Sequence, residues 1–175
     1  MANLPGTKIS AEKITPGIAE MLLGNAFLCG GLTLSQVAAL CDIELYTVQN
    51  WVHRGFVSSP KSKKYNKRQF CRLVIINMLK DALQLSDIAA MLSSINGVLS
   101  DESDDTVADD DLYILFLELL CTVNEGCSEA EIEKTADKLS GENKKLKNVL
   151  TSMYYAYRSS QFKKKATEII GSNIK

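Results

Sequence analysis

The sequence contains a single histidine, His53, and only five cysteines, no two of which are spaced as Cys-x-x-Cys. A tetrahedral zinc site would therefore need four cysteines drawn from remote parts of the chain. An odd number of cysteines without close pairing is not typical of a disulfide framework either. We expect reduced thiols, with Cys29 and Cys71 packed as small core residues, and neither a metal nor any other cofactor.

Long hydrophobic runs are also lacking. Residues 18–28 are apolar, but Gly24 and Asn25 interrupt them and no basic cluster leads directly into them. Residues 112–123 are apolar too, yet they include Glu118. A membrane-spanning helix needs about 20 apolar residues, and a secretory signal needs a basic segment before its apolar core. We therefore expect a cytoplasmic protein with no membrane partner.

The residues of common catalytic sites are sparse as well. Gly30-Gly31 lacks the later glycines of a dinucleotide-binding loop. With one histidine, neither a Ser-His-Asp nor a Cys-His arrangement is convincing. The acidic residues between 101 and 111 lack the glycine and the terminal glutamate of a calcium-binding loop. The sequence therefore does not predict an enzyme.

Charge is distributed unevenly, although the net charge is only −1. Residues 1–100 contain ten basic and six acidic residues, whereas residues 101–175 contain ten and fifteen. Between 45 and 80 there is no acidic residue, which suits contact with a polyanion such as a phosphate backbone. The eight basic residues of this stretch are Arg54, Lys61, Lys63, Lys64, Lys67, Arg68, Arg72 and Lys80.

An acidic stretch divides the chain into two predicted modules. Asn96-Gly97 is a turn signal, and residues 100–111 carry seven acidic residues and no basic one. Such a run is too hydrated to pack, so we expect a surface linker, whose last residues favour the start of the next helix. The predicted domains are a winged helix-turn-helix domain with an N-terminal helix over 1–95, an acidic linker over 96–106, and a helical dimerisation or effector domain over 107–175.

The first module is predicted to be mainly α-helical. Apolar residues at helical spacing predict helices over 33–40 and 44–53. A further helix is expected after Asn66 and a short one after Ser86, because both residues are favoured helix caps. Residues 55–65 contain glycine, proline and three lysines, which indicates a loop or a short β ribbon.

The second module is predicted to be a helical bundle. Its helices are expected over 112–124, 129–139 and 142–170, and Ser128 fits the pattern of a capping box for the second of them. Lys163-Lys164-Lys165 should lie near the carboxyl end of the last helix, where cations are favourable. The fold class is thus mainly α, with a small β wing in the first module.

Two short helices joined by a tight turn at 41–43 meet the first requirement of a helix-turn-helix. Its second helix, 44–53, would enter the major groove, where Gln and Asn can read adenine through paired hydrogen bonds. The lysine-rich loop beside it would hold phosphates. The residues that we expect to contact DNA are Tyr46, Thr47, Gln49, Asn50, His53, Arg54, Lys61, Lys63, Lys64, Tyr65, Lys67 and Arg68.

These segments resemble the MerR-like winged helix. The resemblance is carried by residues 32–38, by residues 47–57 and by Lys64-Tyr65 at the end of the wing, while residues 73–92 are similar to the two helices that follow the wing. It covers about residues 32–93 and implies a DNA-binding fold with a small β wing. Where that family typically has Arg-Tyr-Tyr, this chain has Gln49-Asn50-Trp51, so the resemblance implies no particular target sequence.

A narrower resemblance is to the bacterial family named domain of unknown function 1836, whose members are thought to carry a MerR-like DNA-binding fold. It is carried by residues 47–52, Lys63-Lys64-Tyr65 and Leu79-Lys80. By position it implies a recognition-helix face over residues 47–51 and a wing over residues 63–65. We expect Trp51 to pack in the core, because its neighbours at helical spacing are apolar.

The patterns together predict a sequence-specific transcriptional regulator that binds double-stranded DNA, with residues 44–53 in the major groove and 55–65 on phosphates. A small module with one nearly all-apolar helix favours a homodimer held by residues 107–175. A small-molecule effector could bind in this bundle, although Tyr154, Tyr155 and Tyr157 are more typical of packing. The alternative is a winged-helix adaptor that binds a protein partner and no DNA.

Overall fold

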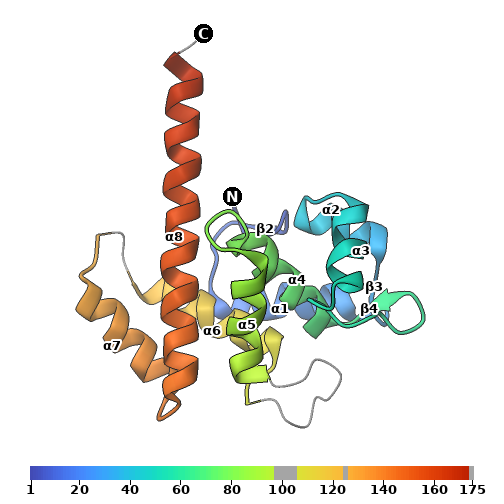
Figure 1. The fold of residues 1–175 in the computed structure, drawn as a ribbon, viewed down its shortest axis with the longest axis horizontal. Coiled ribbons are helices and arrows are strands. Elements are labelled where there is room, and N and C mark those ends of the chain that lie inside the picture. The colour runs from blue at the N-terminus through green and yellow to red at the C-terminus, as the bar shows by residue number, and fades with distance from the viewer. Residues whose placement is uncertain (97–105, 124–125, 174–175) are drawn as a thin grey trace.

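The structure is a computed structural model that describes residues 1–96, 106–123 and 126–173. The described residues are mainly helical, which confirms the predicted class at that level (Figure 1). The strands are β1 (Ala2–Asn3), β2 (Ser10–Ala11), β3 (Leu32–Thr33) and β4 (Lys64–Tyr65). The helices are α1 (Pro16–Phe27), α2 (Leu34–Cys41), α3 (Leu45–His53), α4 (Lys67–Leu79), α5 (Leu85–Asn96), α6 (Asp109–Thr122), α7 (Glu129–Ser140) and α8 (Lys144–Asn173).

Local capping signals explain where several helices begin. Thr33 and Gln36 form a capping box at α2, in which each side chain accepts a hydrogen bond from the other residue's backbone amide. Asn66 and Gln69 do the same at α4, and Ser128 does so with the glutamate three residues later at α7. The predicted cap at Ser86 is wrong, because α5 already begins at Leu85.

A two-stranded antiparallel sheet joins the starts of α2 and α4. Leu32 pairs with Tyr65 and Thr33 pairs with Lys64. Gly31 permits this approach: its φ is +107°, and a Cβ atom there would lie 2.8 Å from the carbonyl oxygen of Tyr65. Residues 55–65, for which a loop or a short ribbon was predicted, form a loop that contains a Lys61–Lys64 bridge and ends in β4, whose partner strand precedes α2.

The helix α4 is the centre of the core. Phe70, Leu73, Val74 and Leu79 on this helix are fully buried, and α4 packs against α1, α2, α5, α6 and α8. In Figure 1 it lies between the α2–α3 pair and the α6–α8 group. The two predicted modules therefore share one continuous hydrophobic core.

The acidic stretch is only partly described, because residues 97–105 lie outside the described part of the chain. Its last residues form the first turn of α6, as predicted from their charge. Asp109, however, is buried with 2% of its surface exposed. The expectation that the whole acidic run is too hydrated to pack is thus wrong at Asp109, because arginines from α4 pair with this carboxylate.

The last helix extends well beyond the rest of the molecule (Figure 1). Its first half packs against α7, α6, α5 and α4, whereas residues 161–172 are all exposed. The cluster Lys163-Lys164-Lys165 was predicted to lie near the carboxyl end of this helix. Because α8 continues to Asn173, the cluster lies further from that end than predicted. Within the described residues, none of the helices has the length and hydropathy that crossing a membrane requires.

Candidate nucleic-acid interface

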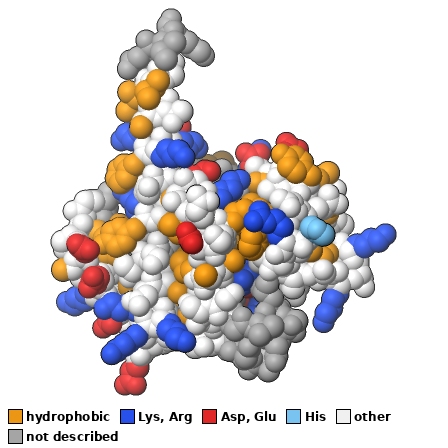
Figure 2. Space-filling model, viewed as in Figure 1, with side chains coloured by type: hydrophobic (Ala, Val, Ile, Leu, Met, Phe, Trp, Pro, Cys, Tyr) orange, Lys and Arg blue, Asp and Glu red, His pale blue; other side chains and the backbone are white. Residues whose placement is uncertain are grey.

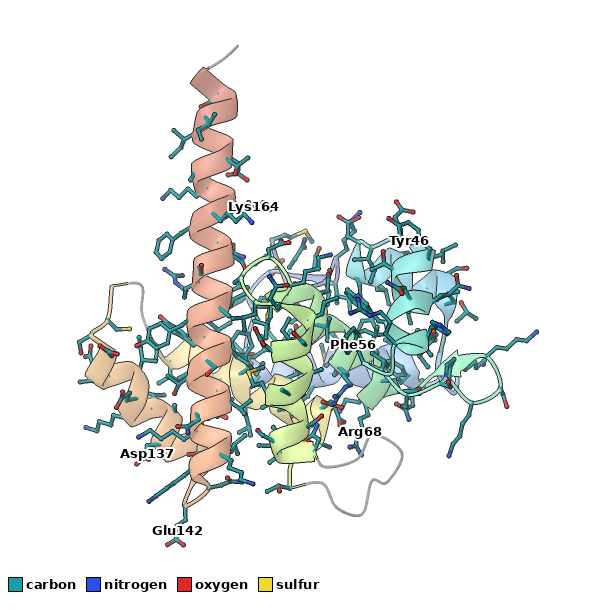
Figure 3. All side chains as sticks on the ribbon, viewed as in Figure 1. Tyr46, Phe56, Arg68, Asp137, Glu142 and Lys164 are labelled. Carbon is teal, nitrogen blue, oxygen red and sulfur yellow. The ribbon has the colours of Figure 1, made fainter. Side chains whose placement is uncertain are left out.

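The helix α3 has one buried side and one exposed side. Val48 and Trp51 point into the core, with Trp51 only 3% exposed, which confirms the predicted core position of this tryptophan. Tyr46, Gln49, Asn50 and His53 recur at three- and four-residue spacing on the opposite side and are exposed. Tyr46 is 69% exposed at the outer end of the helix (Figure 3). Thr47 is half-buried at the edge of this exposed side.

A tight turn sets the position of α3 relative to α2. Asp42 adopts a left-handed conformation with φ of 54° and ψ of 49°, and the Ile43 amide donates to the carbonyl oxygen of Ala38 over 3.1 Å. Asn77 of α4 donates from Nδ2 to the carbonyl oxygen of Cys41 over 2.7 Å. The ammonium of Lys80 lies 5.8 Å from the centre of the Trp51 ring. The helix pair is thus fixed to α4 on its inner side.

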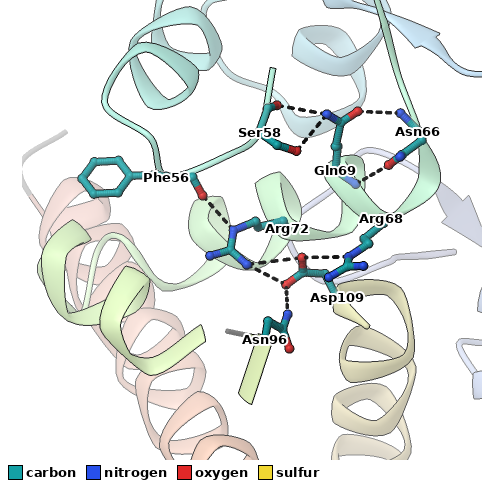
Figure 4. A network of polar contacts seen from close by, with 8 residues as sticks. All are labelled: Phe56, Ser58, Asn66, Arg68, Gln69, Arg72, Asn96 and Asp109. Atoms are coloured by element: carbon teal, nitrogen blue, oxygen red, sulfur yellow. Dashed lines mark hydrogen bonds and ion pairs between the residues drawn. The ribbon is translucent and has the colours of Figure 1, made fainter. Parts of the chain in front are cut away.

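The segment that follows α3 is also anchored to α4. Gln69 donates from Nε2 to the carbonyl oxygen of Ser58 over 3.0 Å, and Arg72 donates from Nε to the carbonyl oxygen of Phe56 over 2.7 Å (Figure 4). Gln69 also donates from Nε2 to the carbonyl oxygen of Ser59 over 3.1 Å. The guanidinium of Arg54 stacks on the Phe56 ring at 4.7 Å. Arg54 is exposed, so this stacking orients a cation at the carboxyl end of α3.

A lysine turn lies beside α3 at the edge of the molecule. Ser62 and Lys63 both have positive φ, at 50° and 60°, and Lys61 and Lys64 form a β-bridge that closes the turn. Lys61, Lys63 and Lys64 are exposed, and basic side chains project freely from this edge in Figure 2. We call residues 61–64 the wing turn.

Behind the wing turn is a depression of about 630 Å³, lined in part by Gly31, Ser58, Lys61 and Lys64. Of the described residues that line it, none is acidic. Lys64 also donates from Nζ to the carbonyl oxygen of Cys29 over 3.2 Å, which fixes one end of the turn to the residues before β3. The depression and the turn together form a basic surface next to α3.

Three of the predicted DNA-contacting residues do not belong to this exposed surface. Tyr65 is only 3% exposed and packs in the core. Lys67 forms an ion pair with Asp110 over 3.1 Å, and the Nε of Arg68 lies 3.8 Å from Oδ2 of Asp109. These two basic side chains are half-buried against the acidic first turn of α6. The other nine lie on α3, directly after it or in the wing turn, and all but the half-buried Thr47 are exposed: Tyr46, Thr47, Gln49, Asn50, His53, Arg54, Lys61, Lys63 and Lys64.

A buried polar network, which the sequence did not reveal, lies under this surface. Arg72 donates from Nη1 to both carboxylate oxygens of Asp109, at 3.1 and 3.3 Å, and Asn96 donates from Nδ2 to Oδ1 over 2.8 Å (Figure 4). Burial raises the pKa of the Asp109 carboxyl, and the Arg72 guanidinium offsets part of that rise. The one signal for this network in the sequence was the stretch of residues 45–80, whose basic residues have no acidic residue within the stretch to pair with.

The thiols give no sign of a metal centre in the described part of the chain. All five cysteines are free, and no group of three or more His, Cys, Asp or Glu residues converges there. Cys71 is buried as predicted, whereas Cys29 is exposed and its predicted core position is wrong. The chemistry available on the α3 side is hydrogen bonding by the amides of Gln49 and Asn50 and by the hydroxyls of Tyr46 and Thr47, together with attraction by cations.

Comparison with protein families gives one match. Residues 31–116 match the family described as domain of unknown function (DUF1836). The matched stretch begins just before β3 and ends within α6, so it includes the α2–α3 pair, the wing turn and the network around Asp109. Over these residues the chain is similar to that family. Neither the search of curated proteins nor the search of solved structures gave a match.

Proposed function

We propose that this protein is a transcriptional regulator that binds double-stranded DNA through a MerR-like winged helix-turn-helix. The observation that carries the proposal is the composition of the exposed side of α3. Gln49, Asn50 and Tyr46 stand free of the protein's own core, on a helix that a tight turn joins to α2. Exposed amides on the second helix of such a pair are suited to direct readout of base edges in the major groove.

The wing turn supports a second kind of contact. Lys61, Lys63 and Lys64 are exposed beside α3, and Arg54 is oriented at the end of that helix by Phe56. Contacts to phosphates supply most of the affinity of a DNA-binding protein and position it on the duplex, whereas base contacts specify the sequence. On this division, the wing turn and Arg54 give affinity and the amides of α3 give specificity.

The proposal includes a homodimer held by residues 107–175, because proteins of this kind usually read two-fold symmetric sites as pairs. Phe162, Ile169 and Ile170 are exposed on α8, and contact with a second copy would cover them.

We also propose that residues 107–175 bind a small-molecule effector. A depression of about 570 Å³ between the end of α6 and α7 offers space for one, whereas Tyr154 is buried and Tyr157 packs on Phe116.

An adaptor that binds a protein partner is the second candidate. The observation in its favour is that Leu45 and Tyr46 are exposed at the start of α3, and apolar surface of this kind is common in protein interfaces. The two candidates differ in what they predict for duplex DNA, so one experiment separates them.

The test is selection from a pool of random duplexes by the purified full-length protein, followed by measurement of affinity for the enriched sequence. The proposal predicts enrichment of a defined sequence. Gln49→Ala or Asn50→Ala should then lose discrimination at one base pair, by about 1–3 kcal/mol. Asn148→Ala, which removes an exposed amide on α8, is the matched control and should change nothing. Absence of any enriched sequence would favour the adaptor.

A further inference from the structure

Arg72 joins two parts of the molecule that are far apart in the sequence. It lies on α4, and its guanidinium donates on one side to the carbonyl oxygen of Phe56 and on the other side to the carboxylate of Asp109. Both charged side chains are only 3% exposed. One buried arginine therefore contacts both the segment that follows α3 and the first turn of α6 (Figure 4).

Asp109 is itself held from three sides. Arg72 and Arg68 approach it from α4, and the amide nitrogen of Asn96 donates to it from the end of α5. A carboxylate that gathers donors from two helices has a fixed position and orientation. The start of α6 and the end of α5 thus determine where the Arg72 guanidinium can sit.

Two contacts continue this path toward the exposed side of α3. The amide of Phe56 donates to the carbonyl oxygen of Trp51 over 2.9 Å, and the ring of Phe56 supports the guanidinium of Arg54. Phe56 lies at the end of α3 opposite Tyr46 (Figure 3). A displacement of Phe56 would move Arg54, one of the cations that the proposed function assigns to phosphate contact.

Stability alone does not require a charged pair here. A buried ion pair pays a large desolvation cost, and replacing both partners with apolar residues of similar volume is often neutral or stabilising. What the planar arginine adds is a fixed set of donors that points at two acceptors at once. We infer that Asp109 acts through Arg72 as a positioning residue for the DNA-binding surface, so that the packing of α6 and α5 sets the affinity for DNA. This inference rests on the proposed function, because Arg54 is taken as a DNA contact.

The decisive variant is Arg72→Met combined with Asp109→Leu, which removes both charges and keeps similar volume. It should fold with a moderately lowered melting temperature, because no buried ion is left behind from the pair but the Asn96 amide and the Phe56 carbonyl oxygen each lose a hydrogen bond. It should nevertheless bind the enriched duplex about two- to thirty-fold more weakly, and the backbone amides of residues 54–59 should exchange hydrogen faster. If affinity and exchange both match the wild type, the pair is merely structural and the inference is overturned.

Asp110→Asn is the matched control. It breaks the Lys67–Asp110 ion pair, which joins the same two helices at 3.1 Å, and it leaves the Arg72–Phe56 hydrogen bond in place. The inference predicts no loss of affinity and wild-type exchange for this control, in which the freed Lys67 at the depression can only favour DNA, and an equal loss in both variants would overturn it. If the double variant fails to fold, Asp109→Asn is compared with Asp110→Asn by the same two measurements, the affinity for DNA and the hydrogen exchange at residues 54–59. If the wild-type protein binds no duplex, the proposed function fails together with the part of the inference that concerns DNA affinity, and the exchange at residues 54–59 decides only whether Asp109 positions this segment through Arg72.

Discussion

Cys41 and Cys71 are completely enclosed by the core, whereas Cys29 lies at the surface. Burial raises the pKa of the Cys41 thiol to about 12, and it raises that of Cys71 as well. Because the thiolate is the reactive form, both thiols should resist alkylation at about pH 8 while Cys29 reacts. Mass spectrometry of the native and the unfolded protein after brief labelling checks this order. Labelling of Cys41 as fast as Cys29 in the native protein would contradict the packing of α2 on α4.

The small β3–β4 sheet requires a glycine at position 31, because a side chain there would collide with β4. Gly31→Ala would place a Cβ atom 2.8 Å from the carbonyl oxygen of Tyr65 at a positive φ. We expect the free energy of unfolding to fall by more than about 1 kcal/mol. Gly24→Ala is the control, since a Cβ there meets nothing within 4 Å, and it should stabilise α1 by about 0.5–1 kcal/mol. Urea denaturation measures both, and equal stability of the two variants would refute the described pairing.

At the scale of the element, the start of α2 rests on the capping box of Thr33 and Gln36. Thr33→Ala removes the side-chain acceptor for the Gln36 amide and should lower the free energy of unfolding by about 1 kcal/mol. Ser35→Ala, at an exposed position of the same helix, should have little effect because alanine favours the helix. Denaturant titrations of the two variants make the comparison. A larger loss in Ser35→Ala would show that the box does not fix this helix.

Elements with local signals could be predicted from the sequence. The starts of α2, α4 and α7 follow from a capping residue and a glutamine or glutamate three positions later, and the two sides of α3 follow from helical spacing. The β3–β4 pairing could not be predicted in this way. It involves two residues on each strand, from segments separated by α2 and α3, so neither strand carries a periodic pattern.

The sequence predicted which residues of the candidate site are exposed. It did not predict which basic residues form ion pairs with residues distant in the sequence. The exposed residues of α3 and the wing turn follow from helical spacing and from the lysine-rich loop. Lys67 and Arg68 are basic like the residues of the wing turn, but they form ion pairs with acidic residues about forty positions later in the sequence. Only the three-dimensional packing of α6 on α4 reveals that these cations neutralise the protein's own carboxylates.

At the scale of the whole molecule, buried side chains of both predicted modules join in one hydrophobic core. This core surrounds α4, and among the described residues the end of α8 extends away from it. The exposed apolar residues on that extension support the proposed homodimer. Sedimentation equilibrium of the full-length chain should therefore give about twice the monomer mass of 19.3 kDa at micromolar concentration. A mass of one chain over the whole concentration range would remove the dimer from the proposal.

The central claim is that the wing turn holds phosphates beside a recognition helix. Fluorescence anisotropy with duplex DNA across a salt series tests it on three proteins: the wild type, Lys63→Glu/Lys64→Glu, and the control Lys144→Glu/Lys145→Glu, which makes the same charge change at the start of α8. We predict that the affinity of the wild type for DNA falls steeply with salt. The Lys63→Glu/Lys64→Glu variant should lose most of its affinity and about two units of the logarithmic salt slope. The control should keep the affinity and the salt slope of the wild type. Equal binding by all three proteins, or no binding by the wild type, would contradict the claim.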